Sequence, residues 1–399
     1  MATLSHPSSE PQIGPDRPAA KELLGVVAQL CAPIRDSERE AGRVRSLTQN
    51  GLSWSTILET AADHCLVPLV SKRLLEFSGD ALPGLWRDRF RHEFVASAHR
   101  NLLMSGELVR VLRTLERSGI QAVPFKGPAL AQRAYGDLAL RQFSDLDIVL
   151  PHSQIAQAHA ALENLDYRSK NAAEAMVQNR IPGQYAYRSA ARAALIELHT
   201  EKTMRYLPVP LDWRALGGRM ETVLVGGQPL LTFSAEDTMM LLCVHGSKHF
   251  WTRLAWICDI AQLIESREGF DWTRAETIAQ KMRCYRMWLL GLALAQDVFA
   301  AELPDAISSK IRSEARVIEM SQRVQARYLL SGESAIGAKE RVRFRRVSQD
   351  NFATSLRQLS VFATRPTDDD WNSRSLPQWA APLYAILRPL RILRNSGRN

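Results

Sequence analysis

The sequence predicts an α+β protein in which a small mixed β-sheet core is flanked by N-terminal and C-terminal helical regions. Three observations support this class. Helical patterns of apolar residues dominate the first part of the chain, short apolar runs bounded by Gly and Pro follow, and a second long helical region comes after them. The 399 residues, 46% of them hydrophobic and 23% charged, are enough for two or three structural units.

We predict five segments along the chain. They are a disordered lead (1–20), an N-terminal helical region (21–119), a mixed α/β core (120–232), a C-terminal helical region (233–330) and a basic tail with an amphipathic segment (331–399). The lead is rich in Ser, Pro and Gly and lacks the apolar run of an export signal.

The first helical region has two clear patterns. Apolar residues recur at spacings of three and four from Trp54 to Phe77, and Leu85 to Arg117 has the pattern of one long amphipathic helix. Gly119 is well placed to end that helix, because a left-handed backbone costs glycine little.

In the centre, apolar runs between turn residues predict strands, and their neighbours predict short helices. The expected strands are Gln121–Phe125, Asp145–Leu150, Ala194–His199 and Glu221–Val225, and the expected helices are Ala129–Tyr135 and Ser153–Leu165. Ser234 begins a pattern typical of a helix N-cap, and helices with at least one break are expected from Glu236 to about Tyr328.

Composition limits the environment and the partners. The five cysteines are scattered without a CxxC spacing, which argues against a thiolate zinc site and indicates a reducing cytoplasm. No apolar run of about 18 residues occurs, so no transmembrane segment is expected. The net charge is +9, but 12 Lys/Arg against 5 Asp/Glu place +7 of it in residues 339–399. This weakens any prediction that the whole molecule binds nucleic acid.

The basic tail allows two interpretations. Arg388, Arg391 and Arg394 are spaced three apart beside Tyr384, as in an amphipathic helix that contacts an anionic membrane surface peripherally or helps to dock a nucleic acid. Alternatively, the tail packs back onto the protein with its arginines solvated or paired. We favour the second.

The main candidate for catalysis is the acid pair Asp145 and Asp147. Alternate residues of a strand project to the same face, so the two carboxylates lie side by side. Such neighbours repel each other unless a cation lies between them, and Mg²⁺ prefers oxygen ligands. An isolated D-x-D is more often a solvated turn than a metal site.

Two further elements strengthen that hypothesis. Lys126-Gly127-Pro128 joins a strand to a helix, where a phosphate can approach the glycine backbone and the lysine charge. Glu197 supplies a third acid, with His199 two residues later on the same face. Three acids suit two-metal phosphoryl transfer, and Glu197 is also a candidate to accept a proton from the attacking group.

These elements occur in the order found in a known family. VPFKGPALAQRAYGDLALRQFSDLDIVLP followed by LIELH resembles the uncharacterised bacterial nucleotidyltransferase family of the DNA polymerase beta-like superfamily. DHCLVPLV, LLCVHGSKHFWTRLAWICDIAQLI and the LYAILRPLR tail extend the resemblance from about Leu52 onward. The usual Gly-Ser turn is replaced by Lys126-Gly127, with Ser144 as a candidate for the missing hydroxyl.

The resemblance implies a metal-dependent transfer of a nucleotidyl group from a nucleoside triphosphate, with release of pyrophosphate. It implies Mg²⁺ (or Mn²⁺) held by Asp145, Asp147 and Glu197, which are also the catalytic residues. It assigns triphosphate or phosphate contacts to Lys126, Gly127, Ser144, Arg141 and Lys248, with Arg253 a weaker candidate. Because relatives often accompany biosynthetic clusters, it implies a small-molecule, sugar or peptide acceptor.

Other interpretations stay open. His245, Lys248, His249 and Thr252 are spaced as one helix face, but no Glu lies between the histidines, which argues against a zinc protease site. Trp256 is most simply a packing residue. The acceptor could instead be nucleic acid or protein, or the fold could be a catalytically inactive nucleotide-binding module.

Overall fold

The computed structural model describes residues 17–48, 53–171, 173–177, 184–200, 213–266 and 269–356, together with Leu383 and Leu387. Residues 1–16 of the predicted lead and most of the basic tail, including Arg388, Arg391 and Arg394, lie outside this part of the chain. The architecture is α+β, as the sequence predicts: mostly helical, with a five-stranded mixed sheet and a separate hairpin. The finer domain boundaries remain predictions.

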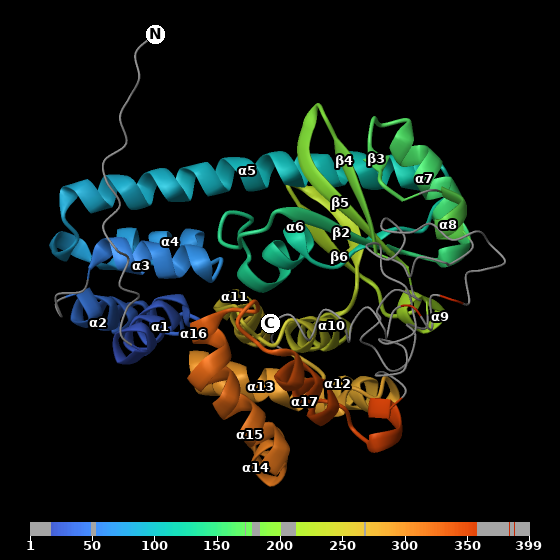
Figure 1. Ribbon diagram of the computed structural model, residues 1–399. Coiled ribbons are helices and arrows are strands. Elements are labelled where there is room, and N and C mark those ends of the chain that lie inside the picture. The colour runs from blue at the N-terminus through green and yellow to red at the C-terminus, as the bar shows by residue number, and fades with distance from the viewer. Residues whose placement is uncertain are drawn as a thin grey trace.

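The N-terminal region is helical. Its elements are α1 (Arg17–Cys31), α2 (Ser37–Thr48), α3 (Trp54–Asp63), α4 (Val67–Phe77), the 3-10 turn η1 (Gly79–Ala81) and α5 (Gly84–Arg117). The long helix is therefore confirmed, and Gly119 after it has φ +72°, the left-handed backbone expected of a terminating glycine. Figure 1 shows α5 running above α3 and α4 and continuing to the sheet, on which its second half packs.

The central sheet has the strand order β1-β2-β5-β4-β3, and its only parallel pair among the described strands is β2 with β5. The strands are β1 (Val123–Pro124), β2 (Asp145–Leu150), β3 (Arg168–Ser169), β4 (Gln184–Ser189) and β5 (Arg192–Thr200). The helices between them are α6 (Gly127–Leu130), the π-helical turn η2 (Ala131–Tyr135), the 3-10 turn η3 (His152–Gln154), α7 (Ile155–Glu163) and α8 (Ala173–Val177).

The two faces of the sheet differ because side chains alternate along each strand. Leu146, Ile148, Ile196 and Leu198 are fully buried in a cluster that includes apolar residues of α5 and α7. The opposite face carries the acids of β2 and β5 and looks toward α10. The apolar face thus holds the strands in place while the polar face forms the site.

The strand predictions are confirmed, with one correction. Glu221–Val225 is a strand (β6), and it pairs with β7 (Gln228–Thr232) in a separate antiparallel hairpin. β1 is shorter than the expected Gln121–Phe125 because only Val123 and Pro124 have ladder partners on β2. The strands β3 and β4 and the second hairpin strand were not predicted from the sequence.

The C-terminal region is helical, as expected from Ser234 onward, and the Ser234 side chain accepts a hydrogen bond from the Asp237 N–H. Its elements, preceded by the short α9 (Trp213–Gly217), are α10 (Ala235–Lys248), α11 (Leu254–Glu265), α12 (Trp272–Lys281), α13 (Tyr285–Phe299), α14 (Asp305–Ser313), α15 (Ala315–Arg323), the π-helical turn η4 (Val324–Tyr328), α16 (Leu329–Ser331) and α17 (Ala338–Val347).

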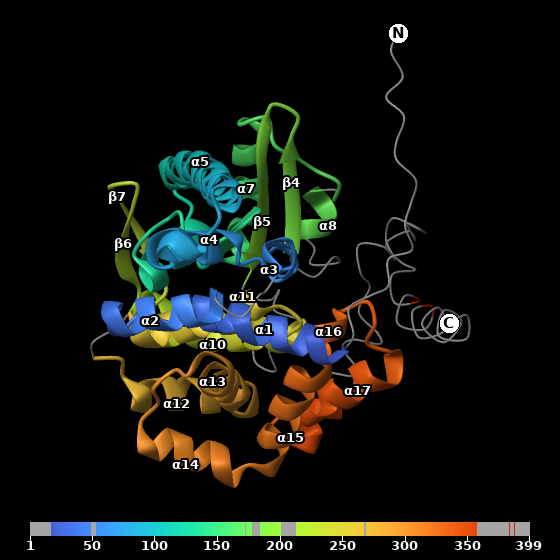
Figure 2. The same ribbon diagram turned by 90° about the vertical axis from the view of Figure 1, so that its left-hand side faces the viewer.

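The two helical regions pack on each other although they are far apart in the sequence. One buried cluster joins Val27 and Leu69 of the N-terminal helices to Trp251 and Trp288 of the C-terminal region. In the turned view (Figure 2), α1 lies in the layer between the sheet and α12 to α15, where it contacts α11. The N-terminal and C-terminal helices therefore share one hydrophobic core.

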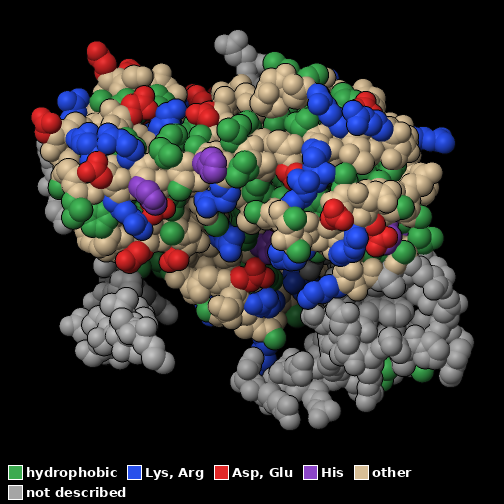
Figure 3. All heavy atoms as spheres, turned by 90° about the horizontal axis from the view of Figure 1, so that it is seen from above, with side chains coloured by type: hydrophobic (Ala, Val, Ile, Leu, Met, Phe, Trp, Pro, Cys, Tyr) green, Lys and Arg blue, Asp and Glu red, His purple; other side chains and the backbone are tan. Residues whose placement is uncertain are grey.

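Two features bear on possible partners. Within the described ranges, no helix is both long and apolar enough to cross a membrane. Seen from above (Figure 3), the Lys and Arg side chains of the described residues are interspersed with Asp and Glu and do not form one continuous basic surface.

Candidate active site

The register of the central parallel pair brings the predicted acids together. Asp147 of β2 lies opposite Glu197 of β5, and Asp145 lies opposite Leu195. His199, two residues after Glu197, projects from the same face of its strand. The polar side chains therefore meet on one face of the sheet, at neighbouring positions of two strands.

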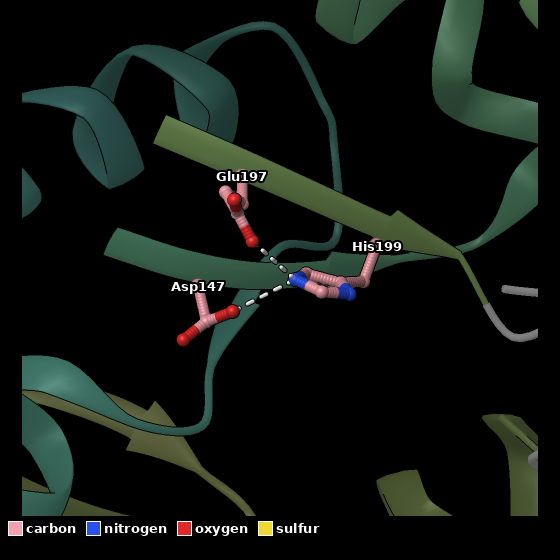
Figure 4. A group of neighbouring side chains, drawn as sticks. All are labelled: Asp147, Glu197 and His199. Carbon is pink, nitrogen blue, oxygen red and sulfur yellow. Dashed lines mark hydrogen bonds and ion pairs between the residues drawn. The ribbon is translucent and has the colours of Figure 1, made fainter. Parts of the chain in front are cut away.

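Asp147, Glu197 and His199 form a compact group (Figure 4). The His199 Nε2 atom lies 2.8 Å from Asp147 Oδ1 and 3.7 Å from Glu197 Oε2. One candidate ligand atom from each residue lies within 4.8 Å of the other two. Two neighbouring carboxylates supply oxygen donors suited to a divalent cation, with the imidazole beside them.

Hydrogen bonds orient this group. Because a carboxylate only accepts, the Nε2 atom of His199 carries the hydrogen that it donates to Asp147. The Gln184 side-chain amide on β4 donates to Glu197 Oε2. Gln184 had not been singled out from the sequence, because nothing there indicates that β4 lies beside β5.

Lys126 supplies the positive charge beside the acids. Its Nζ atom lies 3.5 Å from Asp147 Oδ2 and 3.1 Å from His245 Nδ1. The ammonium group has only donors, so the His245 Nδ1 atom accepts this hydrogen bond. Lys126 thus connects the acid group on the sheet to the end of α10.

Gly127 has a structural reason for being glycine. Its φ is +54°, and a Cβ atom there would lie 3.4 Å from the Asp145 carbonyl oxygen. A side chain at this position would be strained by the positive φ, although its Cβ atom would make only an ordinary contact with β2. The glycine lets the turn pass close to the acid-bearing strand. Its contact with phosphate remains a prediction.

The three carboxyl groups have different electrostatic environments. Burial raises the pKa of Asp145 and of Glu197, and the charge of Asp147 raises both further. Burial also acts to raise the pKa of Asp147, but the Lys126 charge and the His199 hydrogen bond outweigh it and hold that pKa well below its usual range. Asp147 is therefore the carboxylate most firmly kept ionised.

A cavity of about 680 Å³ opens beside these residues. Five predicted site residues line it, namely Lys126, Arg141, Ser144, Asp145 and Asp147. Gly127, Glu197 and Lys248 do not contribute to its wall. Further parts of the wall come from 63–66 after α3, from His245 to Trp256, and from 329–333.

Arg141, which lines the cavity, forms an ion pair with α11. Its Nε and Nη2 atoms lie 2.8 and 2.9 Å from the two carboxylate oxygens of Asp259 on α11. The Tyr135 hydroxyl donates to the same carboxylate at 2.8 Å. The sequence carries no signal for Asp259, which is 118 residues from Arg141. The role of Arg141 as a phosphate ligand stays a prediction.

The prediction that His245, Lys248, His249 and Thr252 share one helix face is wrong. α10 ends at Lys248, and Phe250 and Trp251 have φ values of +57° and +55°, which end the helical path. This reversal occurs because the Trp251 and Phe250 side chains are fully buried. His245, His249 and Thr252 nevertheless line the cavity. The assignment of Lys248 to the triphosphate remains a prediction.

The model of a family described as "Uncharacterised nucleotidyltransferase" matches residues 50–300. No protein with a curated description matches the chain.

Two solved structures show partial likeness. The antibiotic-resistance factor ANT(2'')-Ia is 13% identical, with a TM-score of 0.28 over 53% of this chain and 94% of that chain. An antigenic nucleotidyltransferase-like protein from Paracoccidioides brasiliensis is 15% identical, with a TM-score of 0.31 over 51% of this chain and 96% of that chain. Both TM-scores are below 0.5, so no argument depends on them.

Proposed function

The chain belongs to the uncharacterised nucleotidyltransferase family, and on this premise we propose that it transfers a nucleotidyl group from a nucleoside triphosphate to an acceptor hydroxyl, releasing pyrophosphate. The observation that supports this most strongly is the convergence of Asp147, Glu197 and His199 beside a cavity of about 680 Å³, which Asp147 lines. Mg²⁺ or Mn²⁺ is the proposed cofactor.

The residues at the proposed metal centre fit a divalent cation. Asp145, Asp147 and Glu197 are the proposed ligands. His199 orients Asp147 and Gln184 orients Glu197, whereas Asp145 lies outside the compact group and is proposed from its place on the same face of β2. A divalent ion bound there would neutralise phosphate charge and activate the attacking oxygen. Asp147 is the strongest candidate because it is only 4% exposed and is kept ionised by Lys126 and His199.

Cationic and hydroxyl groups along the cavity suit a triphosphate. Lys126 and Arg141 add positive charge, and the exposed Ser144 side chain adds a hydroxyl beside Asp145. Charge-assisted hydrogen bonds of this kind are stronger than neutral ones. We assign these three residues to the phosphates and retain Gly127 and Lys248 as weaker assignments, because neither lines the cavity.

The proposed step transfers the nucleotidyl group from the triphosphate to the acceptor oxygen. The acceptor oxygen forms a bond to the α-phosphorus, and the bond from that phosphorus to the pyrophosphate oxygen breaks. Pyrophosphate leaves with the electron pair of the broken bond. The acceptor proton passes to Glu197, whose side chain is 17% exposed beside Asp147.

The size of the cavity favours a small acceptor. Its volume of about 680 Å³ lies within the range of about 300–1,000 Å³ that is typical of small-molecule sites. Its wall combines residues 63–66, the core and the segment from Leu329 to Glu333, so a bound acceptor would contact several parts of the chain. We therefore propose a small-molecule, sugar or peptide acceptor.

A pyrophosphate-release assay tests the proposal. Each nucleoside triphosphate is incubated with Mg²⁺ or Mn²⁺ and a panel of acceptors, using wild type, Asp147→Ala and the control Asp166→Asn. Asp166 is a surface acid whose φ of +64° asparagine also adopts readily. Release by wild type and the control but not by Asp147→Ala supports the function. Equal release by all three proteins rejects the assigned site.

A further inference from the structure

Three flat rings lie together on the cavity wall next to the acid group. His245 and His249 come from the end of α10, and Trp256 comes from the first turn of α11. The ring centroids are 4.9 Å apart for the two histidines, 5.4 Å for His245 and Trp256, and 5.2 Å for His249 and Trp256. All three residues line the cavity. They are called the ring cluster below.

Packing alone does not account for the ring cluster. Phe250 and Trp251, which lie between its members in the sequence, are fully buried in the core. The three rings of the cluster keep part of their surface exposed. The chain reversal at Phe250 and Trp251 therefore places two rings in the core and holds the other three at the cavity.

The rings of the cluster are held in fixed orientations. Their planes are tilted by 58° between the two histidines, 87° between His245 and Trp256, and 37° between His249 and Trp256, so each ring offers its own face. Burial lowers the pKa of both histidines, and the Lys126 charge lowers that of His245 further. His245 accepts from Lys126 through Nδ1, and His249 Nδ1 lies 3.1 Å from Glu333 Oε2. These hydrogen bonds limit rotation of both histidines, and a ring face held in this way is suited to stacking against another unsaturated ring.

Its position relative to the acids suits one kind of ligand. Lys126 bridges the two sites, because its Nζ atom contacts both Asp147 and His245. A ligand with phosphates at Lys126 and the acids would extend its other end along the same wall toward Trp256. A nucleoside triphosphate has this composition: phosphates at one end and a flat base at the other.

We propose that His245, His249 and Trp256 form the site that binds the nucleobase of the nucleoside triphosphate, mainly through stacking. This inference rests on the proposed function for the phosphate end of the ligand. The base end can be tested without any chemical step. Stacking of one base on an aromatic side chain contributes about 1–3 kcal/mol, or roughly 5- to 150-fold in affinity.

Binding measurements on the full-length protein separate the two ends of the ligand. The probes are ATP, inorganic tripolyphosphate and adenosine, each measured by isothermal titration calorimetry with Mg²⁺ present. The variants are Trp256→Leu and Trp256→Phe, and the matched control is Trp272→Leu. Trp272 is also partly buried and packs on Phe270 with centroids 4.7 Å apart, but it does not line the cavity.

We expect Trp256→Leu to weaken ATP binding at least fivefold, to abolish detectable adenosine binding, and to change tripolyphosphate binding less than about twofold. Trp256→Phe should recover most of the ATP affinity because it restores a ring. Trp272→Leu should match wild type with every probe.

Two results would overturn the inference. One is an equal loss of ATP and tripolyphosphate affinity in Trp256→Leu, which would mean that the residue only supports the fold. The other is nucleotide binding that does not depend on the base or on Trp256. It would appear as wild-type affinity of Trp256→Leu for ATP and adenosine, or as a wild-type protein that binds tripolyphosphate as tightly as ATP. A failure of the proposed function instead appears as base-dependent binding without pyrophosphate release.

Discussion

Asp259 holds Arg141 in a bidentate ion pair beneath the cavity, with N–O distances of 2.8 and 2.9 Å. The Asp259 side chain is 1% exposed and that of Arg141 is 12% exposed. The pair ties the loop that precedes the acid-bearing strand to α11. The position of one wall of the candidate site thus depends on an acid that is distant in the sequence.

Asp259→Ala should be strongly destabilising. It removes the acceptor of both Arg141 and Tyr135 and leaves a buried guanidinium without its partner, which typically costs about 3–5 kcal/mol. Urea unfolding of the purified variant measures this change in the free energy of unfolding. The double variant Arg141→Met/Asp259→Leu should recover most of the loss, because no uncompensated charge remains. A single-variant loss below about 1 kcal/mol would contradict the prediction.

Gly246→Ala should destabilise the C-terminal helices. A Cβ atom at Gly246 would overlap the six-membered ring of Trp251, which is fully buried and cannot move away. Overpacking of this kind costs roughly 1–3 kcal/mol. The control is Gly106→Ala in α5, where a Cβ atom would meet nothing within 4 Å. It should gain about 0.5–1 kcal/mol from the better helix propensity of alanine, and both changes are measured by thermal or urea unfolding.

His64 should make folding stability depend on pH. Its Nδ1 atom accepts from the Leu254 N–H at 3.2 Å, and burial lowers its pKa from 6.5 to about 4, with Asp63 opposing and Arg253 assisting this shift. Between these two values the unfolded chain binds more protons than the folded one. Stability is therefore fully present above the unfolded pKa and falls as the pH drops toward 4, by up to about 3 kcal/mol.

Urea unfolding at several pH values between about 4.5 and 7.5 tests this prediction. His64→Gln should be less stable at neutral pH but should lose much of the pH dependence. The control His92→Gln, at an exposed position of α5, should keep the slope of wild type. A His64 variant with an unchanged slope would show that other groups cause the pH dependence.

Divalent cations should bind in the absence of nucleotide and depend on the acid group. Glu197→Gln and Asp147→Asn should each weaken Mn²⁺ binding by roughly tenfold or more, since even residues that only orient a metal ligand cost 10- to 100-fold when removed. Mn²⁺ titrations followed by electron paramagnetic resonance or calorimetry give the affinity directly. Asp166→Asn should bind as wild type does. Equal affinity in all four proteins would place the cation elsewhere.

The sequence by itself determined the elements whose signal is local. β2 spans Asp145–Leu150 as predicted, because an apolar run that ends in proline identifies a buried strand. The shared face of Asp145 and Asp147 follows from the two-residue period of any strand. α5 and its terminating glycine were predicted for the same reason: helix periodicity and a left-handed C-terminal residue are visible within a few turns.

Tertiary structure alone decided which distant segments meet. The β2–β5 register that sets Asp147 opposite Glu197, the Arg141–Asp259 pair and the wall from Leu329 to Glu333 join residues that are tens to hundreds of positions apart. Such contacts arise from burying the apolar faces of the sheet and helices together, and no local pattern encodes the partner. The end of α10 at Lys248 has the same cause, because the burial of Phe250 and Trp251 overrides the helical spacing of the neighbouring polar residues.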